Sequence, residues 1–247
     1  MIHIDDSDVV KPDGFKFESL GIVRDGSEST STKNVYKKGY PITEACVLTT
    51  SNHPVSIFSR IHSSSEKNYK SANTITFDAI AQDAALFSKA TFVMDRGYDD
   101  NKMFLKLDEL GQEYVIRLTS KRKLLYHNKW TPTTELRNRR KGKVKTNVFY
   151  KGKDHEAYLS HVKVQITASR KNIYLVLVYG IPGNDFNGIR NKCTKSCNYK
   201  NSRPCEGKSF LLLLLTGKRH LRHTFICQRG RQTLVPDKTS CIPSTLP

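Results

Sequence analysis

The chain has 247 residues, and 41 Lys and Arg against 23 Asp and Glu give it a net charge of +18. Hydrophobic residues make up 37% of it, which supports a packed core and excludes disorder throughout. The positive surplus favours a polyanionic partner, either nucleic acid or an anionic membrane surface. The longest apolar run, residues 210–215, is too short to cross a bilayer, and the first residues carry no secretory signal. We therefore expect neither an integral nor a secreted protein.

The chain contains six cysteines. A disulfide framework is not expected without a secretory signal. Cys193 and Cys197 have the spacing of half a zinc site, but Cys205 follows eight positions later without a close partner. Free thiols in a loop are therefore favoured over zinc, which stays open as the lesser alternative.

The first half of the chain reads as alternating strands and helices. Residues 1–10 form a short apolar strand that runs into acids, and residues 25–32 read as a loop. Hairpin-turn residues at 51–54 separate two strands. Apolar spacing predicts helices and compact apolar runs predict strands further along. The expected strands are 42–50, 54–61, 90–94 and 113–118, and the expected helices are 72–89 and 99–110.

The second half is basic and mainly β. Residues 117–151 contain twelve Lys or Arg and a single acid, Glu135. Strand-like runs follow at 156–167, 173–179 and 209–216. The order of elements predicts an α/β domain with a mixed sheet flanked by helices, followed by a β-rich basic insertion. We expect three segments: 1–118, the β-rich insertion 119–216, and an irregular tail 217–247.

Two carboxylates fall at the ends of predicted apolar strands. Asp5 follows the apolar start of the first strand, and Asp95 follows residues 90–94. Sites in α/β sheets gather at the carboxyl ends of strands, and carboxylate oxygens suit magnesium. Two metal ions about 4 Å apart can activate an attacking oxygen and stabilise a leaving one at a phosphodiester. The alternative is that each acid is a turn former or helix cap, and that the basic run is a solvated face.

The residues around these acids resemble a known family. The opening, Ile4 to Pro12, and residues 23–27 resemble the first-aspartate motif of bacterial insertion-sequence transposases of the DDE type. The string Val93 to Asp99 resembles the second-aspartate motif. The resemblance covers residues 1–180 and more loosely extends to Thr216. It implies a ribonuclease H-like fold, a site that uses magnesium or manganese, and cutting and rejoining of transposon-end DNA.

Carried over by position, the resemblance makes Asp5 and Asp95 the first two catalytic acids and the metal ligands. It favours Asp5 over its acidic neighbours because an apolar residue precedes it and Ser7 follows two positions later. Arg96 and Tyr98 are expected to shape the site or contact DNA, with a surface loop as the alternative. Gly97 is expected to allow a close backbone approach or an unusual turn. Further DNA-binding residues are expected in the basic segment: Lys121, Arg122, Lys123, Arg137, Arg139, Arg140, Lys141, Lys143 and Lys145.

The resemblance also implies partners and a location. The partner is double-stranded DNA, both transposon ends and target, and a protein homodimer holds two ends. No membrane partner is expected, because the basic residues do not form an amphipathic helix. A bacterial cytoplasmic protein associated with the nucleoid is the expectation.

The third acid of the family has no counterpart here. The family pattern places it as a Glu on a helix after the insertion, in the order Tyr, two residues, Arg, three residues, Glu, six residues, Lys. From Lys218 onward the only acid is Asp237, and Glu206 precedes the last apolar run instead. No separate DNA-binding region precedes Ile2. We therefore expect a catalytic core shortened at both ends, with a frameshift near or before Gly217.

Two alternative functions stay open at this point. The chain could be a non-catalytic DNA-binding remnant of a transposase, in which the basic insertion still binds DNA phosphates. It could also be another ribonuclease H-like nuclease, such as a junction resolvase or an RNA-cleaving enzyme. The two local motifs and the β insertion favour the transposase.

Overall fold

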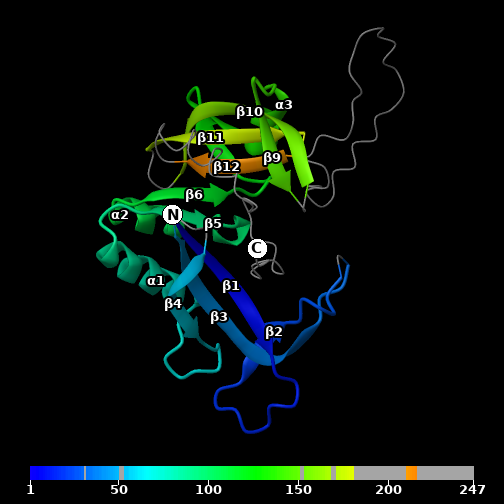
Figure 1. The fold of residues 1–247 in the computed structure, drawn as a ribbon, viewed down its shortest axis with the longest axis vertical. Coiled ribbons are helices and arrows are strands. Elements are labelled where there is room, and N and C mark those ends of the chain that lie inside the picture. Colours follow the sequence, from blue (N-terminus) through cyan, green and yellow to red (C-terminus); the bar gives the residue numbers. More distant parts are fainter. Residues whose placement is uncertain (31, 50–52, 151–152, 168–170, 181–209, 216–247) are drawn as a thin grey trace, which may run out of the picture. The chain divides into compact units, whose positions relative to one another are not determined.

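A computed structural model describes residues 1–30, 32–49, 53–150, 153–167, 171–180 and 210–215 (Figure 1). The chain divides into two units, residues 1–116 (unit 1) and residues from 117 onward (unit 2). The tail 217–247 and the cysteines from Cys193 onward lie outside the described residues. The expectations of a frameshifted tail and of free thiols therefore stay predictions.

Unit 1 is built around a mixed sheet with β1 at its centre. Strand β3 pairs with β1 in the antiparallel direction and β5 pairs with its other side in the parallel direction. Strands β2 and β4 pair antiparallel with β3, and β6 pairs parallel with β5. The strands are β1 (Ile2–Val10), β2 (Gly21–Arg24), β3 (Tyr36–Leu48), β4 (Pro54–Ile61), β5 (Thr91–Met94) and β6 (Glu113–Arg117).

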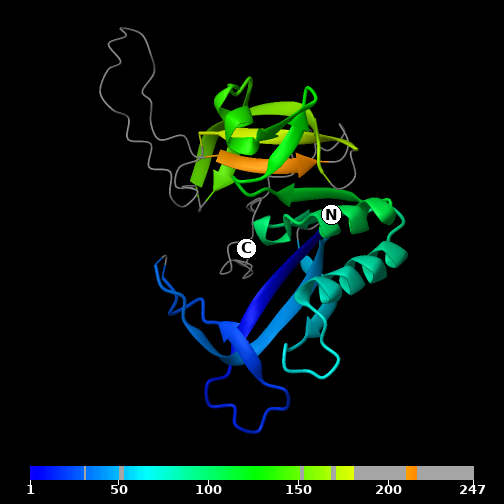
Figure 2. The ribbon, with the colours of Figure 1, turned by 180° about the vertical axis from the view of Figure 1, so that it is seen from behind.

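Two helices cover one face of this sheet. Helix α1 (Ala72–Leu86) packs against β3, β4 and α2 (Asn101–Glu109), and both views show α1 and α2 side by side (Figures 1 and 2). The Phe104 ring of α2 lies 5.6 Å from the Tyr114 ring of β6. The covered face carries the buried side chains of Ile2, Ile4 and Phe92. Burial of these apolar groups is the main stabilising contribution to unit 1.

Local signals explain where these helices begin. The Ser71 side chain accepts a hydrogen bond from the Thr74 amide at the start of α1. The Asp100 side chain accepts one from the Lys102 amide at the start of α2. Both are standard N-caps, which satisfy amides that the helix itself leaves unpaired.

The expected strands and helices of unit 1 are confirmed, with several corrections. Strand β2 was not expected, because four residues are too few to show a pattern, and β3 begins at Tyr36 rather than at residue 42. Helix α1 ends at Leu86 rather than at residue 89, because Phe87 already has extended backbone angles. A short 3-10 helix, η1 (Arg96–Tyr98), precedes α2, which begins at residue 101 rather than 99.

Unit 2 is mainly β, as expected. An antiparallel sheet runs in the order β12, β11, β10, β7, β8, and β9 also pairs with β10. Helix α3, inside the basic segment, was not expected, because six residues cannot establish a helical period. The elements are β7 (Lys123–Tyr126), β8 (Lys129–Pro132), α3 (Thr133–Asn138), β9 (Val144–Tyr150), β10 (Lys153–Gln165), β11 (Asn172–Tyr179) and β12 (Phe210–Leu215).

A tight turn joins β7 to β8. Its two central residues, His127 and Asn128, have positive φ angles of 48° and 58°. This is the geometry of a two-residue hairpin whose twist matches that of the flanking strands. Among the described residues, no helix is long and apolar enough to span a membrane.

Candidate active site and basic surface

Asp5 and Asp95 lie next to each other in the sheet of unit 1. The parallel ladder between β1 and β5 ends with Ile4 paired to Met94, and each Asp is the next residue in its own strand direction. One correction applies to the sequence prediction. Asp5 does not end its strand, because β1 continues to Val10 as the partner of β3. The pairing with β5 ends at Ile4, so Asp5 and Asp95 are neighbours at the carboxyl end of this parallel ladder.

The backbone after Asp95 folds onto its carboxylate. The Gly97 amide donates a hydrogen bond to Asp95 Oδ1 at 2.6 Å, so Asp95 is the N-cap of η1. A Cβ at position 97 would lie 2.9 Å from that oxygen, closer than real side chains approach. Glycine leaves room here for the Asp95 carboxylate, which agrees with a close approach, one of the two roles expected for Gly97.

Tyr98 is buried, with only 6% of its surface exposed. Burial raises the pKa of its hydroxyl far above the usual value, and the negative charges of Asp6, Asp5 and Asp95 raise it further. The negative charges of three carboxylates therefore disfavour ionisation of the Tyr98 hydroxyl. Of the two roles expected for Tyr98, its burial favours shaping of the site, whereas Arg96 is exposed.

Asp6 belongs to a network that sequence reasoning did not find. Its Oδ1 accepts a hydrogen bond of 2.7 Å from the Thr43 hydroxyl. The same hydroxyl lies 3.0 Å from Nε2 of His62. His62 is 1% exposed, and its ring stacks on Tyr69 with a centroid distance of 5.9 Å. The signal that could have pointed to Thr43 is the strand register, which sets it directly opposite Asp6.

The side-chain oxygens of Asp5 and Asp95 are of the type that binds divalent cations. Carboxylate oxygens are the ligands that magnesium and manganese prefer, and magnesium keeps several waters in its shell. Within the part of the chain that the structure describes, no group of three or more His, Cys, Asp or Glu side chains is arranged to hold a metal ion.

The basic segment of unit 2 contains cations in different environments. Arg139 pairs with Glu135, and Lys145 pairs with Glu156. Arg137 is half-buried, and burial lowers its pKa. Among the residues predicted to bind DNA, four lysines are exposed and have no ion pair with another described residue: Lys121, Lys123, Lys141 and Lys143.

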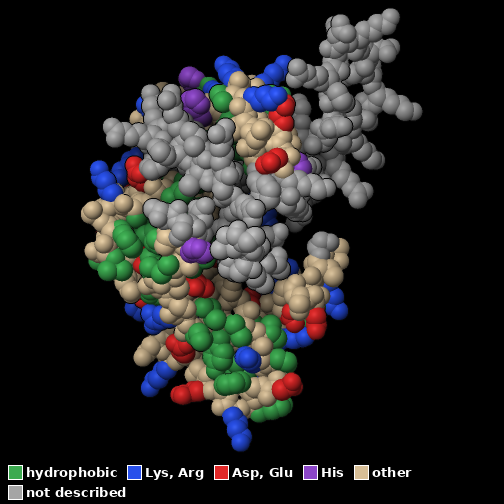
Figure 3. Space-filling view, in the orientation of Figure 1, with side chains coloured by type: hydrophobic (Ala, Val, Ile, Leu, Met, Phe, Trp, Pro, Cys, Tyr) green, Lys and Arg blue, Asp and Glu red, His purple; other side chains and the backbone are tan. Residues whose placement is uncertain are grey.

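The visible surface of the protein carries Lys and Arg side chains with Asp and Glu between them (Figure 3). Among the residues that this view colours, the basic side chains are therefore not gathered into one uniform face.

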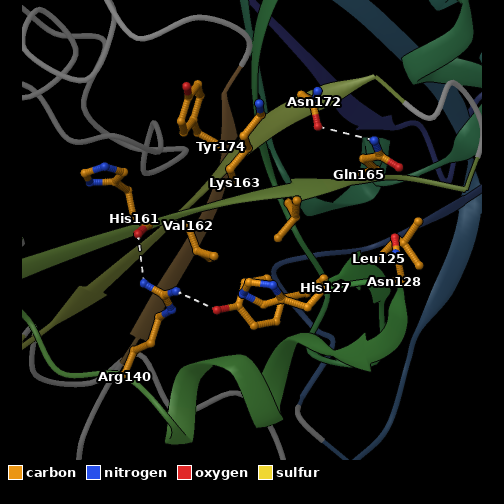
Figure 4. Close-up of a pocket in the computed structure, with 12 residues that line it drawn as sticks. Leu125, His127, Asn128, Arg140, His161, Val162, Lys163, Gln165, Asn172 and Tyr174 are labelled. Carbon is orange, nitrogen blue, oxygen red and sulfur yellow. Dashed lines mark hydrogen bonds between the residues drawn. The ribbon is translucent and has the colours of Figure 1, made fainter.

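Arg140 lies in an open pocket of about 620 Å³ between the β7–β8 turn and strands β10 and β11 (Figure 4). Its guanidinium donates hydrogen bonds of 3.1 Å to the Tyr126 hydroxyl and to the His161 carbonyl. It also lies over the Tyr126 ring, 5.6 Å from the centroid. Lys163 lines the same pocket, and no Asp or Glu is among the described residues that form its wall. The pocket is therefore a positively charged hollow with aromatic walls.

A sequence model of one family, described as a transposase DDE domain, matches residues 4–203 of this chain. Because the match covers well over half of the chain, the protein belongs to the DDE transposase family. A comparison with curated proteins finds no match. The mixed α/β architecture, with a parallel β1–β5–β6 arrangement and antiparallel strands on the other side of β1, is compatible with the ribonuclease H-like domain of that family.

Proposed function

We propose that this family member is a DDE-type DNA transposase whose catalytic acids are Asp5 and Asp95. The observation that supports this most is the register of β1 and β5, which sets these two residues side by side. The family match begins at residue 4 and includes both acids. The proposed reaction is the cleavage of a phosphodiester at a transposon end, followed by strand transfer to target DNA.

The two carboxylates would hold magnesium or manganese between them. Bound divalent cations activate the attacking oxygen and stabilise the leaving oxygen of a phosphodiester. The chain's own contribution is to hold the ligands in place. The Gly97 amide fixes one oxygen of Asp95, and the second oxygen would be a ligand for the ion. Tyr98, which is buried three residues after Asp95, would help to shape the site.

The basic residues supply the DNA contacts in this proposal. Exposed Arg96 lies next to Asp95 and is placed to meet a phosphate near the site. In unit 2, Lys121, Lys123, Lys141 and Lys143 carry most of the electrostatic attraction of the predicted set. Arg122, Arg137, Arg139, Arg140 and Lys145 complete the predicted set, with Arg139 and Lys145 weakened by their Glu partners. Such contacts position DNA without reading its sequence.

A second candidate is a DNA-binding remnant that no longer cleaves. Two observations favour it. Among the described residues no third acid joins Asp5 and Asp95, and the sequence after Glu206 contains no Glu. We propose a frameshift near or before residue 217 as the origin of this composition. Translation of the other two frames downstream would reveal the Tyr, Arg, Glu and Lys pattern, and its absence from both frames would refute the frameshift.

A plasmid nicking assay with the full chain separates the two candidates. The substrate is supercoiled plasmid that carries the genomic DNA flanking the coding sequence, with magnesium or manganese. The transposase proposal predicts metal-dependent nicking that disappears in Asp5→Asn and in Asp95→Asn, while both variants bind the plasmid as the wild type does. Binding without nicking in all three proteins would identify the remnant. Nicking that survives in both variants would refute the assignment of the two acids. The predicted homodimer and location at the nucleoid stay predictions.

A further inference from the structure

The short segment between α3 and β9 carries four cations in five residues. It consists of residues 139–143, and we call it the 139–143 loop. Exposure alternates along it, because Arg140 and Gly142 are half-buried whereas Lys141 and Lys143 are exposed. Neither lysine has an ion pair with another described residue. The loop therefore turns two residues toward the protein and two lysines toward solvent.

The first attachment of the 139–143 loop is the side chain of Arg140. Its guanidinium donates hydrogen bonds of 3.1 Å to the His161 carbonyl on β10 and to the Tyr126 hydroxyl on β7 (Figure 4). It also lies over the Tyr126 ring, 5.6 Å from the centroid. A planar guanidinium can hold two acceptors in a fixed geometry, which the ammonium of a flexible lysine does less well. Arg140 is therefore engaged with the strands of unit 2, although the sequence placed it among the DNA contacts.

The second attachment is the hydroxyl of Tyr179 on β11. It lies 3.2 Å from the carbonyl oxygens of both Arg137 and Arg140, and it shares its hydrogen between them. The last carbonyls of a helix have no partner within the helix, and Arg137 is in the last turn of α3. Tyr179 therefore ties the end of α3 and the start of the 139–143 loop to the same sheet.

The third attachment is a close backbone contact with β10. A Cβ at position 142 would lie 2.2 Å from the Cβ of Tyr158 and 2.9 Å from its carbonyl carbon, closer than real side chains approach. Glycine therefore fits here, and a larger residue requires a shift of the loop or of the strand. The amide of Lys143 then donates a hydrogen bond of 2.7 Å to the Leu159 carbonyl. Both ends of the 139–143 loop are thus fixed to strands of unit 2.

We propose that Arg140, Tyr179 and Gly142 are positioning residues that hold the 139–143 loop in one conformation, so that its two exposed lysines are ready to meet DNA phosphates. This inference rests on the proposed function, because it concerns how one group of that function's DNA contacts is held. A flexible loop loses conformational entropy when it binds, and a loop that is already ordered avoids this loss. Such pre-organisation raises the affinity for DNA without adding a contact.

Three test variants release the loop and leave the net charge unchanged. Tyr179→Phe removes one hydroxyl, Arg140→Lys removes the planar fork, and Gly142→Ala adds a Cβ against β10. Tyr174→Phe is the matched control on the same strand as Tyr179. Tyr174 is also half-buried, and its hydroxyl makes no hydrogen bond with another described residue. All variants are made in the full chain, with circular dichroism and urea unfolding to verify the fold.

Hydrogen exchange in the absence of DNA tests the attachment itself. We expect the amides of Arg140 and Lys143 to exchange about fivefold faster in Tyr179→Phe, the factor that one lost hydrogen bond gives. Gly142→Ala should accelerate exchange at Lys143 at least as much, and Tyr174→Phe should match the wild type. Unchanged rates in Tyr179→Phe would show that its hydroxyl does not hold the loop, and this result would overturn the inference.

Fluorescence anisotropy with a labelled DNA duplex then tests the connection to DNA. We expect each of the three test variants to weaken binding by about fivefold, the factor for ordering about one loop residue on binding. Tyr174→Phe should stay within about twofold of the wild type. The same three substitutions are then made in a chain that already carries Lys141→Ala and Lys143→Ala. There each should change the affinity by less than about twofold, because the loop has no lysines left to present.

This comparison separates positioning from direct contact. An equal loss in both backgrounds for Arg140→Lys would make Arg140 itself a DNA contact and refute its positioning role. Normal DNA binding in Tyr179→Phe, together with faster exchange of the loop amides, would make the attachment purely structural and overturn the inference. A wild-type chain that binds no DNA would refute the DNA contacts of the proposed function and the inference with them. The exchange rates distinguish that result from a loop that is not fixed.

Discussion

Replacement of Lys141 and Lys143 by Ala should make DNA binding less sensitive to salt. Each lysine that neutralises a phosphate adds roughly −0.9 to the slope of log affinity against log salt on duplex DNA. In the predicted DNA-binding set, four exposed lysines have no ion pair with another described residue: Lys121, Lys123, Lys141 and Lys143. If all four meet phosphates, the slope is about −3.6, and affinity falls about 150-fold between about 50 and about 200 mM salt.

The double variant should then have a slope of about −1.8 and lose only about 12-fold in affinity over the same salt range. Fluorescence anisotropy with labelled duplexes of unrelated sequence measures both quantities. The matched control is Arg139→Ala with Lys145→Ala, two cations that are already paired with Glu135 and Glu156. We expect the control to change the slope by less than about half a unit. An unchanged slope in Lys141→Ala, Lys143→Ala would show that these lysines only solvate the protein surface.

Three further predictions concern stability, each measured by thermal or urea unfolding of the full chain. Burial raises the pKa of the Asp83 carboxyl from 3.8 to about 6. The unfolded chain therefore loses this proton at a lower pH than the folded chain, and the free energy of unfolding falls as the pH rises from 3.8 to about 6. Asp83→Asn should reduce this dependence of stability on pH. Hydrogen bonds from Ser27 and Lys37 hold the pKa of Asp25 far below its usual value of 3.8, so its contribution is present above that pH and is lost in strong acid. Asp25→Asn should therefore be less stable than the wild type at neutral pH, and the two should converge in acid; a constant difference would contradict this. Phe104→Ala should lower the free energy of unfolding by about 3–5 kcal/mol, because the ring is fully buried. Leu105→Ala changes an exposed neighbour and should lower it by less than about 1 kcal/mol. Equal losses in the two variants would contradict the packing of α2.

Much of the structure of unit 1 could be predicted from local patterns in the sequence. The apolar residues Ile2 and Ile4 and the run Phe92 to Met94 predict the two strands, and strand ends predict where acids gather. The pairing of β1 with β5 then brings Asp5 and Asp95 together without any further information. Strand β2 and helix α3 were missed because four and six residues contain at most two repeats of the strand or helix period, and neither is a continuous apolar run like β5.

The network at Asp6 could not be predicted in the same way. Thr43 lies 37 positions after Asp6, and His62 follows 19 positions after Thr43. Neither a threonine within a β-rich run nor a histidine after one carries a local signal. Their contact depends on the register of three strands, which a single sequence does not specify. The ion pairs of Arg139 and Lys145 were missed for a related reason, since a basic run does not show which cations find a carboxylate.

Paramagnetic Mn²⁺, titrated into the isotopically labelled full chain, tests most directly whether Asp5 and Asp95 form one metal site. We expect selective broadening of the signals of Asp5, Asp95 and Gly97, with weak binding, because two carboxylates supply few charged ligands. Either Asp5→Asn or Asp95→Asn should abolish the broadening. A dissociation constant in the low micromolar range would reveal a third ligand outside this pair. Broadening elsewhere, with these three signals unchanged, would contradict the proposed site.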